Sequence, residues 1–339
     1  MKRRVQIIAA ALATVAVAAS VAFARPDAKT GPTKSGVVVI ETNLAYQDGE
    51  AAGTGMVLTS SGQVLTNNHV IRGATTIKVI VPGTGKHYTA KVVGYSTSAD
   101  VAVLQLVGAS NLKTVSLGSS SSPKLGQRVT AIGNAGGTGR LTSASGRIVA
   151  KSRSIDVSDD QGGSEHLSRL IETNASVQPG DSGGPLENAS GKVIGMDTAA
   201  SLGSGFRQTA AGDGFAIPIS RALTVVKQIE SGSSSSTVHV GGTAFLGVTL
   251  ASSQAYGPFG YSGSGAVVQG VLSGGAADAA GLSAGDVITS IDGHAISSPD
   301  ALSSLLLTKH PGDQVSVTYT DQFGASQTAT VTLASGPPQ

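Results

Sequence analysis

The sequence contains no cysteine and no tryptophan, and few of its 339 residues are aromatic or charged. The absence of cysteine excludes disulfide bonds, thiolate metal sites and a cysteine nucleophile. Charged residues make up 13% of the chain, and no basic stripe is present that would attract nucleic acid. Metal-ligand spacings such as His-Glu-x-x-His are also missing, so we expect neither a metal nor a cofactor.

Glycine and short apolar runs are abundant instead. The chain has 46 glycines, and hydrophobic residues make up 40% of it. Its length suggests about two domains at roughly 150 residues each. Short β-branched runs separated by Ser- and Gly-containing turns favour a mainly β architecture over helical bundles.

The first 24 residues have the pattern of an export signal. A Lys-Arg-Arg triplet precedes the apolar run Val5–Ala24, which ends on an A-x-A-like cleavage site, Ala22-Phe23-Ala24. Twenty apolar residues can also span a bilayer, so an uncleaved membrane anchor is the alternative. Both alternatives predict that the chain is exported to the bacterial cell envelope. It would be periplasmic or otherwise extracytoplasmic, or it would be secreted. The polar residues 25–35 predict a disordered lead-in.

One glycine-rich stretch, Asn174–Leu186, carries the strongest chemical signal. It places Ser182 between an aspartate and two glycines, just after a Pro-Gly turn. Glycines let the backbone turn sharply, which would expose the Ser182 hydroxyl and aim the N–H groups of Gly180 and Ser182 at one point. The alternative is a plain surface turn, because a serine is a weak nucleophile without a base.

Two upstream residues could supply the base and an orienting acid. His69 follows the predicted strand Val64–Thr66, and Asp100 opens the apolar run Val101–Leu106. A carboxylate facing such a strand must be paired to stay charged, and it could hold the histidine in the required tautomer. A hydrogen-bonded loop histidine and a strand-capping aspartate are the alternatives. Five other histidines lie in less suitable contexts: His87, His166, His239, His294 and His310.

The remaining pattern predicts about ten short strands and one helix before a flexible linker. A strand followed by a glycine-rich loop near the active site is expected within 126–139, and a polar loop over 156–168. A helix is expected over Ser220–Glu230 with Ser220 as its N-cap. Gly232–Thr237 has the composition of a flexible linker.

The residue order His69, Asp100, Ser182 is that of chymotrypsin, and the surrounding motifs resemble the HtrA (Deg) family of trypsin-like serine proteases with a C-terminal PDZ domain. The motifs that carry the resemblance, in chain order, are Val64–Ile71, Asp100–Leu104, Ala131–Asn134, Gln178–Leu186, Val193–Thr198, Gly214–Pro218, Phe245–Val248 and Gly281–Gly293.

The resemblance covers residues 36 to 333 and implies a mainly β fold. A chymotrypsin-like double β-barrel is expected over 36–230. A Ser/Gly linker would follow over 231–242, then a small α+β PDZ domain over 243–333 and a tail over 334–339.

The resemblance also implies roles for individual residues. Ser182 would attack the scissile carbonyl, His69 would transfer protons and Asp100 would orient His69, with the N–H groups of Gly180, Asp181 and Ser182 as the oxyanion hole. Ser176 and Val177 would lie at the specificity pocket and, having no negative charge, would favour small or medium apolar side chains over Lys and Arg.

In the second domain, the N–H groups of a loop would bind a peptide C-terminus, and a helix capped by Ser298 would line the peptide groove. The loop residues are Phe245, Leu246, Gly247 and Val248.

The implied function is an exported, ATP-independent endopeptidase of protein quality control and the stress response. It would degrade misfolded envelope proteins, with a PDZ domain that binds C-terminal or unfolded segments. The alternative is a peptide-binding, chaperone-like scaffold with a latent protease site. Asp181 departs from the family, which usually has Asn there, and the short segment from Tyr46 to Gly53 leaves little room for a long regulatory loop. A homotrimer is expected from the resemblance alone, with Tyr46 as the available aromatic residue.

Overall fold

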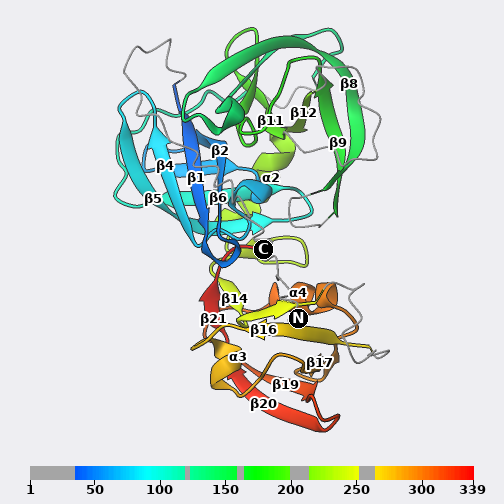
Figure 1. Ribbon diagram of the computed structural model, residues 1–339. Helices are drawn as coiled ribbons and strands as arrows, with labels where there is room; N and C mark the ends of the chain where they lie inside the picture. The colour runs from blue at the N-terminus through cyan, green and yellow to red at the C-terminus, as the bar shows by residue number, and fades with distance from the viewer. Residues whose placement is uncertain (1–34, 119–122, 159–163, 199–213, 252–263) are drawn as a thin grey trace, which may run out of the picture. The chain divides into compact units, whose positions relative to one another are not determined.

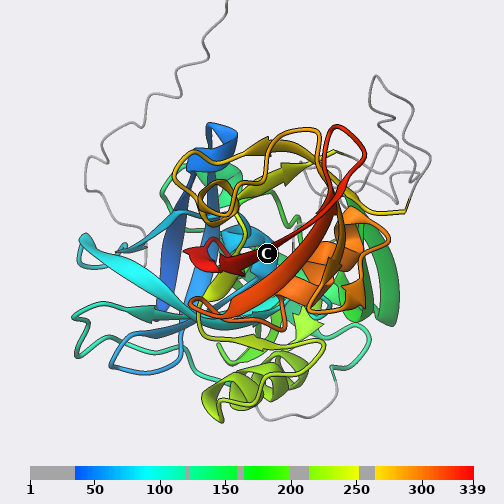
Figure 2. The same ribbon diagram turned by 90° about the horizontal axis from the view of Figure 1, so that it is seen from below.

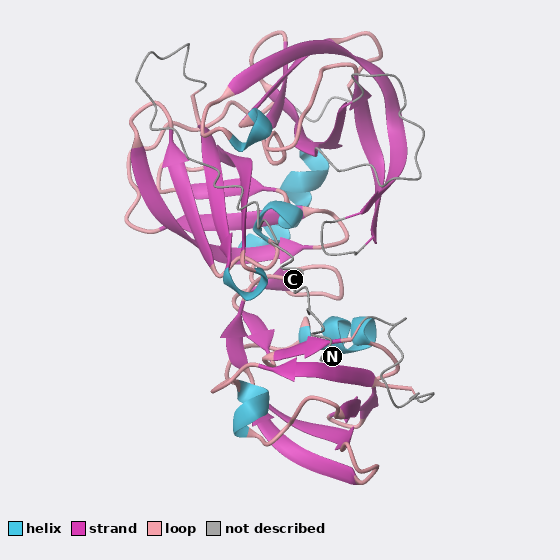
Figure 3. Cartoon of the chain, viewed as in Figure 1, coloured by secondary structure: helices cyan, strands magenta, loops and turns pink. Residues whose placement is uncertain are grey.

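The computed structural model describes residues 35–118, 123–158, 164–198, 214–251 and 264–339. The predicted export signal, and the predicted lead-in up to residue 34, lie outside the described residues. Within the described ranges, no helix combines the length and the apolar character needed to cross a membrane. Strands dominate these ranges (Figure 3).

Six strands form the first barrel, shown in blue and cyan in Figure 1. Their hydrogen-bonded order is β5-β4-β1-β2-β3-β6, and β5 also pairs with β6, which closes the sheet. Their β-branched and leucine side chains fill the interior, where Val38, Ile40 and Leu104 are completely buried. The strands are β1 (Val37–Leu44), β2 (Gly49–Val57), β3 (Gln63–Thr66), β4 (Thr76–Val81), β5 (Lys86–Ser96) and β6 (Val101–Leu106).

A second closed barrel has the strand order β10-β11-β12-β9-β8-β7. The hairpin of β8 and β9 is its longest part (Figure 1). The strands are β7 (Arg128–Gly133), β8 (Thr142–Ser158), β9 (Ser164–Thr173), β10 (Pro185–Asn188), β11 (Val193–Thr198) and β12 (Gly214–Pro218).

The predicted polar loop over 156–168 is wrong at both ends, because β8 runs to Ser158 and β9 begins at Ser164. Asp156 and His166 face each other across this hairpin, and His166 Nδ1 lies 2.6 Å from Asp156 Oδ1. Both side chains are more than half exposed. A strand end that is solvated in this way does not show the alternation by which strands are recognised.

A separate apolar cluster joins the two barrels to helix α2 (Ile219–Glu230). It includes Met56 and Leu65 of the first barrel and Met196 of the second. The helix contacts β5 and β6 as well as β11 and β12 (Figure 1). Ser220 is not its N-cap, because the helix begins one residue earlier at the buried Ile219. Pro218, whose φ is fixed near the helical value, occupies the cap position.

The region predicted as a linker contains strand β13 (His239–Val240), which pairs with Tyr95 and Gly94 of β5. The chain then enters a five-strand path with the order β15-β16-β17-β19-β20 and a short strand β18 beside β17. Figure 2 shows these elements from below, with α4 in orange and the last strands in red. The strands are β14 (Thr243–Phe245), β15 (Val248–Leu250), β16 (Ala266–Val271), β17 (Val287–Ile291), β18 (His294–Ala295), β19 (Gln314–Thr320), β20 (Ser326–Thr332) and β21 (Ala334–Gly336).

Two helices, α3 (Ala276–Ala279) and α4 (Pro299–Leu306), complete this domain. The predicted cap of α4 is confirmed, since the Ser298 hydroxyl accepts a hydrogen bond from the Ala301 N–H at 3.1 Å. Leu302 and Leu306 are buried in the domain core. The predicted tail over 334–339 contains strand β21, which pairs with β14.

Candidate active site

A buried aspartate holds the ring of His69. Asp100 has no exposed surface and precedes β6 directly, whereas His69 lies in the short helix α1 (Asn68–Ile71) just after β3. The His69 Nδ1 atom is 2.9 Å from Asp100 Oδ2 and 3.0 Å from Oδ1. The His69 backbone N–H also donates to Oδ1, at 3.0 Å. These contacts bring together two of the three residues that the sequence singles out.

Neighbouring polar side chains bind Asp100 in its buried position. The Thr198 hydroxyl donates to Oδ2 at 3.2 Å, and the Asn67 side-chain amide donates to the Asp100 carbonyl at 2.9 Å. A carboxylate that only accepts hydrogen bonds places the histidine proton on Nδ1. The Nε2 atom of the neutral ring then carries the lone pair that general-base catalysis needs.

Thr54 of β2 fixes the turn that carries Ser182. Its backbone N–H donates to the Ser182 carbonyl at 2.8 Å, and its hydroxyl donates to the Gly180 carbonyl at 2.7 Å. The same hydroxyl accepts a hydrogen bond from the Asn134 N–H at 2.9 Å. Thr54 therefore links the first barrel to the serine-bearing turn of the second.

Gly180 adopts a backbone conformation that only glycine tolerates at this point. Its φ is 95°, and a Cβ atom here would lie 2.2 Å from the Asn134 carbonyl oxygen. Within the described residues, the Gly180 N–H donates to no acceptor, as an oxyanion donor requires. The Asp181 N–H donates instead to the Gln178 carbonyl at 2.9 Å. Asp181 is therefore not available as the third oxyanion donor that we expected.

The glycine-rich loop after β7 lies against this turn, as the sequence predicts. It forms a short 3-10 helix, Ala135–Gly137, and the Gly136 N–H donates to the Pro179 carbonyl at 2.8 Å. The Asn134 side chain closes the loop by accepting from the Gly139 N–H at 2.7 Å.

The two predicted pocket residues differ in their surroundings. Ser176 is exposed, whereas Val177 is half-buried and packs on Gly214, where a Cβ atom would lie 2.5 Å from Val177 Cγ2. Neither carries a charge that would pair with Lys or Arg.

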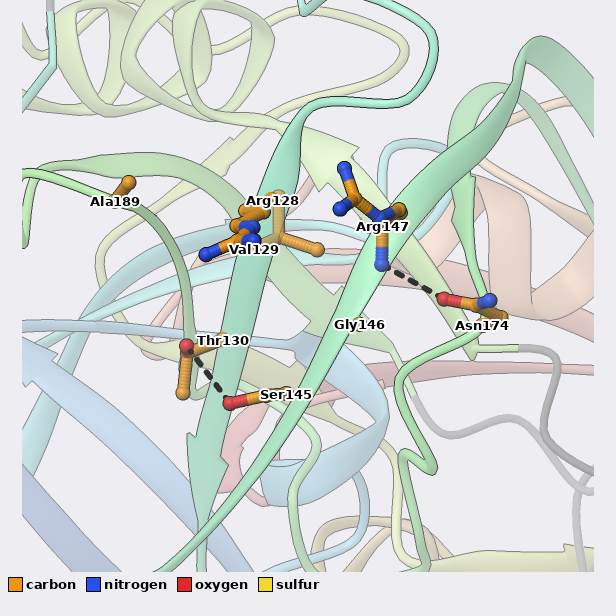
Figure 4. A pocket seen from close by; sticks show the side chains of 8 residues that line it. All are labelled: Arg128, Val129, Thr130, Ser145, Gly146, Arg147, Asn174 and Ala189. Carbon is orange, nitrogen blue, oxygen red and sulfur yellow. Dashed lines mark hydrogen bonds between the residues drawn. The ribbon is translucent and has the colours of Figure 1, made fainter.

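A hollow of about 530 Å³ on the second barrel contains none of the three candidate catalytic residues. Figure 4 shows Arg128 and Arg147 on neighbouring strands in this hollow, and Arg147 donates its backbone N–H to the Asn174 side chain. Its lining residues are Arg128, Val129, Thr130, Ser145, Gly146, Arg147, Asn174 and Ala189.

In the second domain, the loop expected to bind a carboxylate joins β14 to β15. The carbonyl oxygens of Leu246 and Gly247 each accept a hydrogen bond at 2.9 Å, from Ala277 and Leu272. The N–H groups of Leu246 and Gly247 donate to no acceptor among the described residues, and Gly247 has a φ of 80°. β15 is an edge strand of its sheet, with β16 as its described partner. An unpaired edge beside free N–H groups can accept an extended peptide.

Reasoning from the sequence did not single out Thr54 or Thr198. Thr54 lies inside β2 and Thr198 at the end of β11, and threonine is common in strands, so their types carry no signal. Only the fold reveals that Thr54 contacts the serine turn and that Thr198 contacts Asp100.

The comparisons with known proteins agree with this arrangement. Residues 53–196 match the family model of the trypsin-like peptidase domain, and residues 244–333 match that of the PDZ domain. The chain is 33% identical over 309 residues to serine protease PepD of Mycobacterium tuberculosis, covering 88% of this chain and 63% of that protein. It is 35% identical over 270 residues to the periplasmic serine endoprotease DegP of Salmonella typhimurium, covering 79% and 54%.

A solved structure, the HtrA-type protease AlgW with tripeptide, aligns with a TM-score of 0.50 and 31% identity over 91% of this chain and 96% of that one. The double barrel and the following sheet domain thus define a trypsin-like serine protease fold joined to a PDZ domain. The chain belongs to the HtrA (Deg) family. It spans 63% and 54% of the lengths of the two curated relatives named here.

Proposed function

We propose that the chain is a serine endopeptidase that hydrolyses peptide bonds through an acyl-enzyme. Ser182 attacks the scissile carbonyl, while His69 takes its proton and later gives it to the leaving amine. Asp100 orients His69 and stabilises its imidazolium. The N–H groups of Gly180 and Ser182 hold the oxyanion.

The contact between His69 and Asp100 carries this proposal. A fully buried carboxylate within 2.9 Å of Nδ1 is costly to maintain unless it serves a cationic partner. The His69 imidazolium forms when His69 accepts the Ser182 proton. The contact with Asp100 therefore stabilises this cation, which is present during the reaction and not in the resting enzyme.

The proposed substrates are unfolded or misfolded proteins of the cell envelope. The PDZ domain would capture a C-terminal or unfolded segment on the edge of β15, and the Leu246 and Gly247 N–H groups would bind the carboxylate. Relatives named as periplasmic support an envelope location. A preference for small or medium apolar side chains before the cleaved bond follows from the uncharged Ser176 and Val177.

Casein cleavage by the full chain tests the catalytic assignment. We expect hydrolysis, covalent labelling by a fluorophosphonate, and loss of both in Ser182→Ala. Ser190→Ala, which alters an exposed serine eight residues away, is the matched control and should behave as the parent chain does. Equal labelling of the Ser182→Ala variant would contradict the catalytic assignment. Cleavage confined to bonds after Lys or Arg would contradict the proposed side-chain preference.

Peptide binding by the second domain needs its own test. A peptide with a free C-terminal carboxylate should bind, and the same peptide with an amidated C-terminus should bind at least about tenfold more weakly, since each lost charge-assisted hydrogen bond contributes about 1.5 kcal/mol or more. Equal affinities would contradict carboxylate recognition.

A homotrimer stays a prediction from the resemblance. Tyr46, the aromatic residue available for its interface, is 53% exposed. Sedimentation of the full chain would test the oligomeric state.

A further inference from the structure

Two buried carboxyl groups lie beneath the serine-bearing turn. Asp181 precedes Ser182 and is 4% exposed, and Asp197 near the end of β11 has no exposed surface. Backbone hydrogen bonds connect their surroundings: the Gly183 N–H donates to the Asp197 carbonyl at 2.9 Å, and the Asp197 N–H donates to the Gly184 carbonyl at 2.8 Å. The turn and β11 are therefore held together around these two side chains.

The end of strand β7 lies beside both carboxyl groups. A Cβ atom at Gly133 would be 2.6 Å from Asp181 Oδ1, so glycine makes room for that oxygen. The neighbouring Ile132 N–H acts on the Asp197 carboxyl and partly opposes the rise of its pKa. The Asp181 charge also acts on the Asp197 carboxyl, and backbone hydrogen bonds hold β11 against the turn, so the two carboxyls lie near each other.

Three of the four carboxyl oxygens in this region form no hydrogen bond of ordinary geometry in the described part of the chain, although the Ile132 N–H acts on the Asp197 carboxyl. Asp181 Oδ2 accepts from the Gln178 N–H at 2.9 Å. Asp181 Oδ1 and both oxygens of Asp197 form no such hydrogen bond. An ionised carboxylate buried without donors is strongly unfavourable. A proton on one of the two groups would supply the missing donor.

Electrostatics favour Asp197 as the group that keeps this proton. Burial raises the pKa of Asp197 well above its ordinary value, and the neighbouring Asp181 charge raises it further. Burial also raises the pKa of Asp181, but the Gln178 N–H lowers it. Asp181 is thus the better acceptor of the pair.

We propose that Asp197 is a positioning residue of the protease reaction, which donates a shared proton to Asp181 and thereby holds the turn that aims the Gly180 and Ser182 N–H groups. The proposal rests on the proposed role of Ser182. Asp181 fixes the turn from within, since its Oδ2 accepts from Gln178 and its carbonyl accepts from the Gly184 N–H at 2.9 Å.

Two further acidic side chains near these elements, Asp100 and Glu172, are already paired. Asp100, which contacts the neighbouring Thr198, is bonded to His69. Glu172 of β9 lies opposite Phe215 of β12 and is paired with Arg153 at 2.7 Å. Asp181 is the charged group that acts on the Asp197 carboxyl.

Loss of the shared proton at alkaline pH would leave two buried, ionised carboxylates that repel each other and would loosen the turn. The protein should therefore lose kcat/KM at alkaline pH, about tenfold per pH unit beyond the midpoint of this ionisation. Asn at position 197 keeps a donor towards Asp181 but cannot ionise. The variant should retain its kcat/KM where the parent chain loses it.

The test is the pH profile of kcat/KM for the full chain between about pH 5 and about pH 10. Asp197→Asn and Asp181→Asn should each remove the alkaline decline. Asp286→Asn, which alters another buried aspartate outside the pair, should retain it. The proposal is overturned if Asp197→Asn declines at the same pH as the parent chain.

A second measurement does not depend on turnover. In the Ser182→Ala chain, infrared spectroscopy at neutral pH should show a protonated carboxyl band that disappears when Asp197→Asn is added. Hydrolysis without this band would refute the shared proton and leave the proposed function intact. The band without hydrolysis would refute the proposed function alone.

Discussion

The Thr198 hydroxyl donates to the same Asp100 oxygen, Oδ2, that lies 2.9 Å from His69 Nδ1. This third contact limits how the carboxylate can rotate and offsets part of the cost of burying it. Thr198→Val removes the donor at nearly constant volume. We expect kcat to fall about tenfold, since a hydrogen bond to a charged group contributes about 1.5 kcal/mol or more.

Thr198→Ser keeps the hydroxyl and is the matched control, with kcat within about twofold of the parent chain. Steady-state cleavage of a peptide substrate measures both variants. Equal values for Val and Ser at this position would show that the hydroxyl does not act on Asp100.

Thr54 should matter for activity although it contacts no substrate. Thr54→Val would leave the part-buried Gly180 carbonyl and the buried Asn134 N–H without this partner, and each lost buried partner costs about 1–3 kcal/mol. We expect lower stability and a loss of kcat of about tenfold or more, because the Gly180 N–H would no longer be held in place. Thr54→Ser should restore both. Urea unfolding and peptide hydrolysis report the two effects, and a Val variant with full kcat would exclude this role of Thr54.

We expect the contribution of Asp197 to the free energy of unfolding to decline as the pH rises. In the folded chain, burial raises the pKa of Asp197, and the Asp181 charge raises it further. In the unfolded chain, an aspartate titrates at about pH 4. The folded state therefore binds a proton that the unfolded state releases. The stabilisation is fully present below about pH 4 and is lost as the pH rises towards the folded-state pKa, at up to about 1.4 kcal/mol per unit.

Asp197→Asn should remove this slope, so the variant should gain stability relative to the parent chain as the pH increases. Thermal unfolding of the Ser182→Ala chain at several pH values measures the difference without self-cleavage. A constant offset between the two chains would mean that Asp197 does not bind the additional proton.

Arg128 and Arg147 face each other directly on β7 and β8 in the hollow of Figure 4. Like charges directly opposite each other destabilise a sheet. Arg128→Glu should stabilise the chain by about 0.2–1 kcal/mol, with Arg128→Thr intermediate. Urea midpoints measure the gain, which should shrink in high salt. An unchanged midpoint would indicate that the two guanidinium groups already avoid each other.

The strands of both barrels could be predicted because their β-branched runs face packed interiors. The beginning of β9 could not, since its solvated residues look like a loop. Strand β13 was hidden because two residues after a serine-rich stretch gain their structure only from β5. The candidate catalytic residues His69, Asp100 and Ser182 were singled out through their order and local motifs. Thr54 and Thr198 were missed because each contacts a residue far away in the sequence, and the proposed role of Asp197 likewise depends on the fold.

The crowding around two glycines has a consequence for the evolution of new specificities. A Cβ atom at Gly180 or Gly183 would lie 2.2 Å or 2.1 Å from a carbonyl oxygen of the opposing backbone. Substitution at these positions cannot be rescued by repacking side chains, so mutant libraries that include them would consist largely of inactive members. Diversity is better placed at the proposed pocket residues Ser176 and Val177, whose side chains are exposed and half-buried.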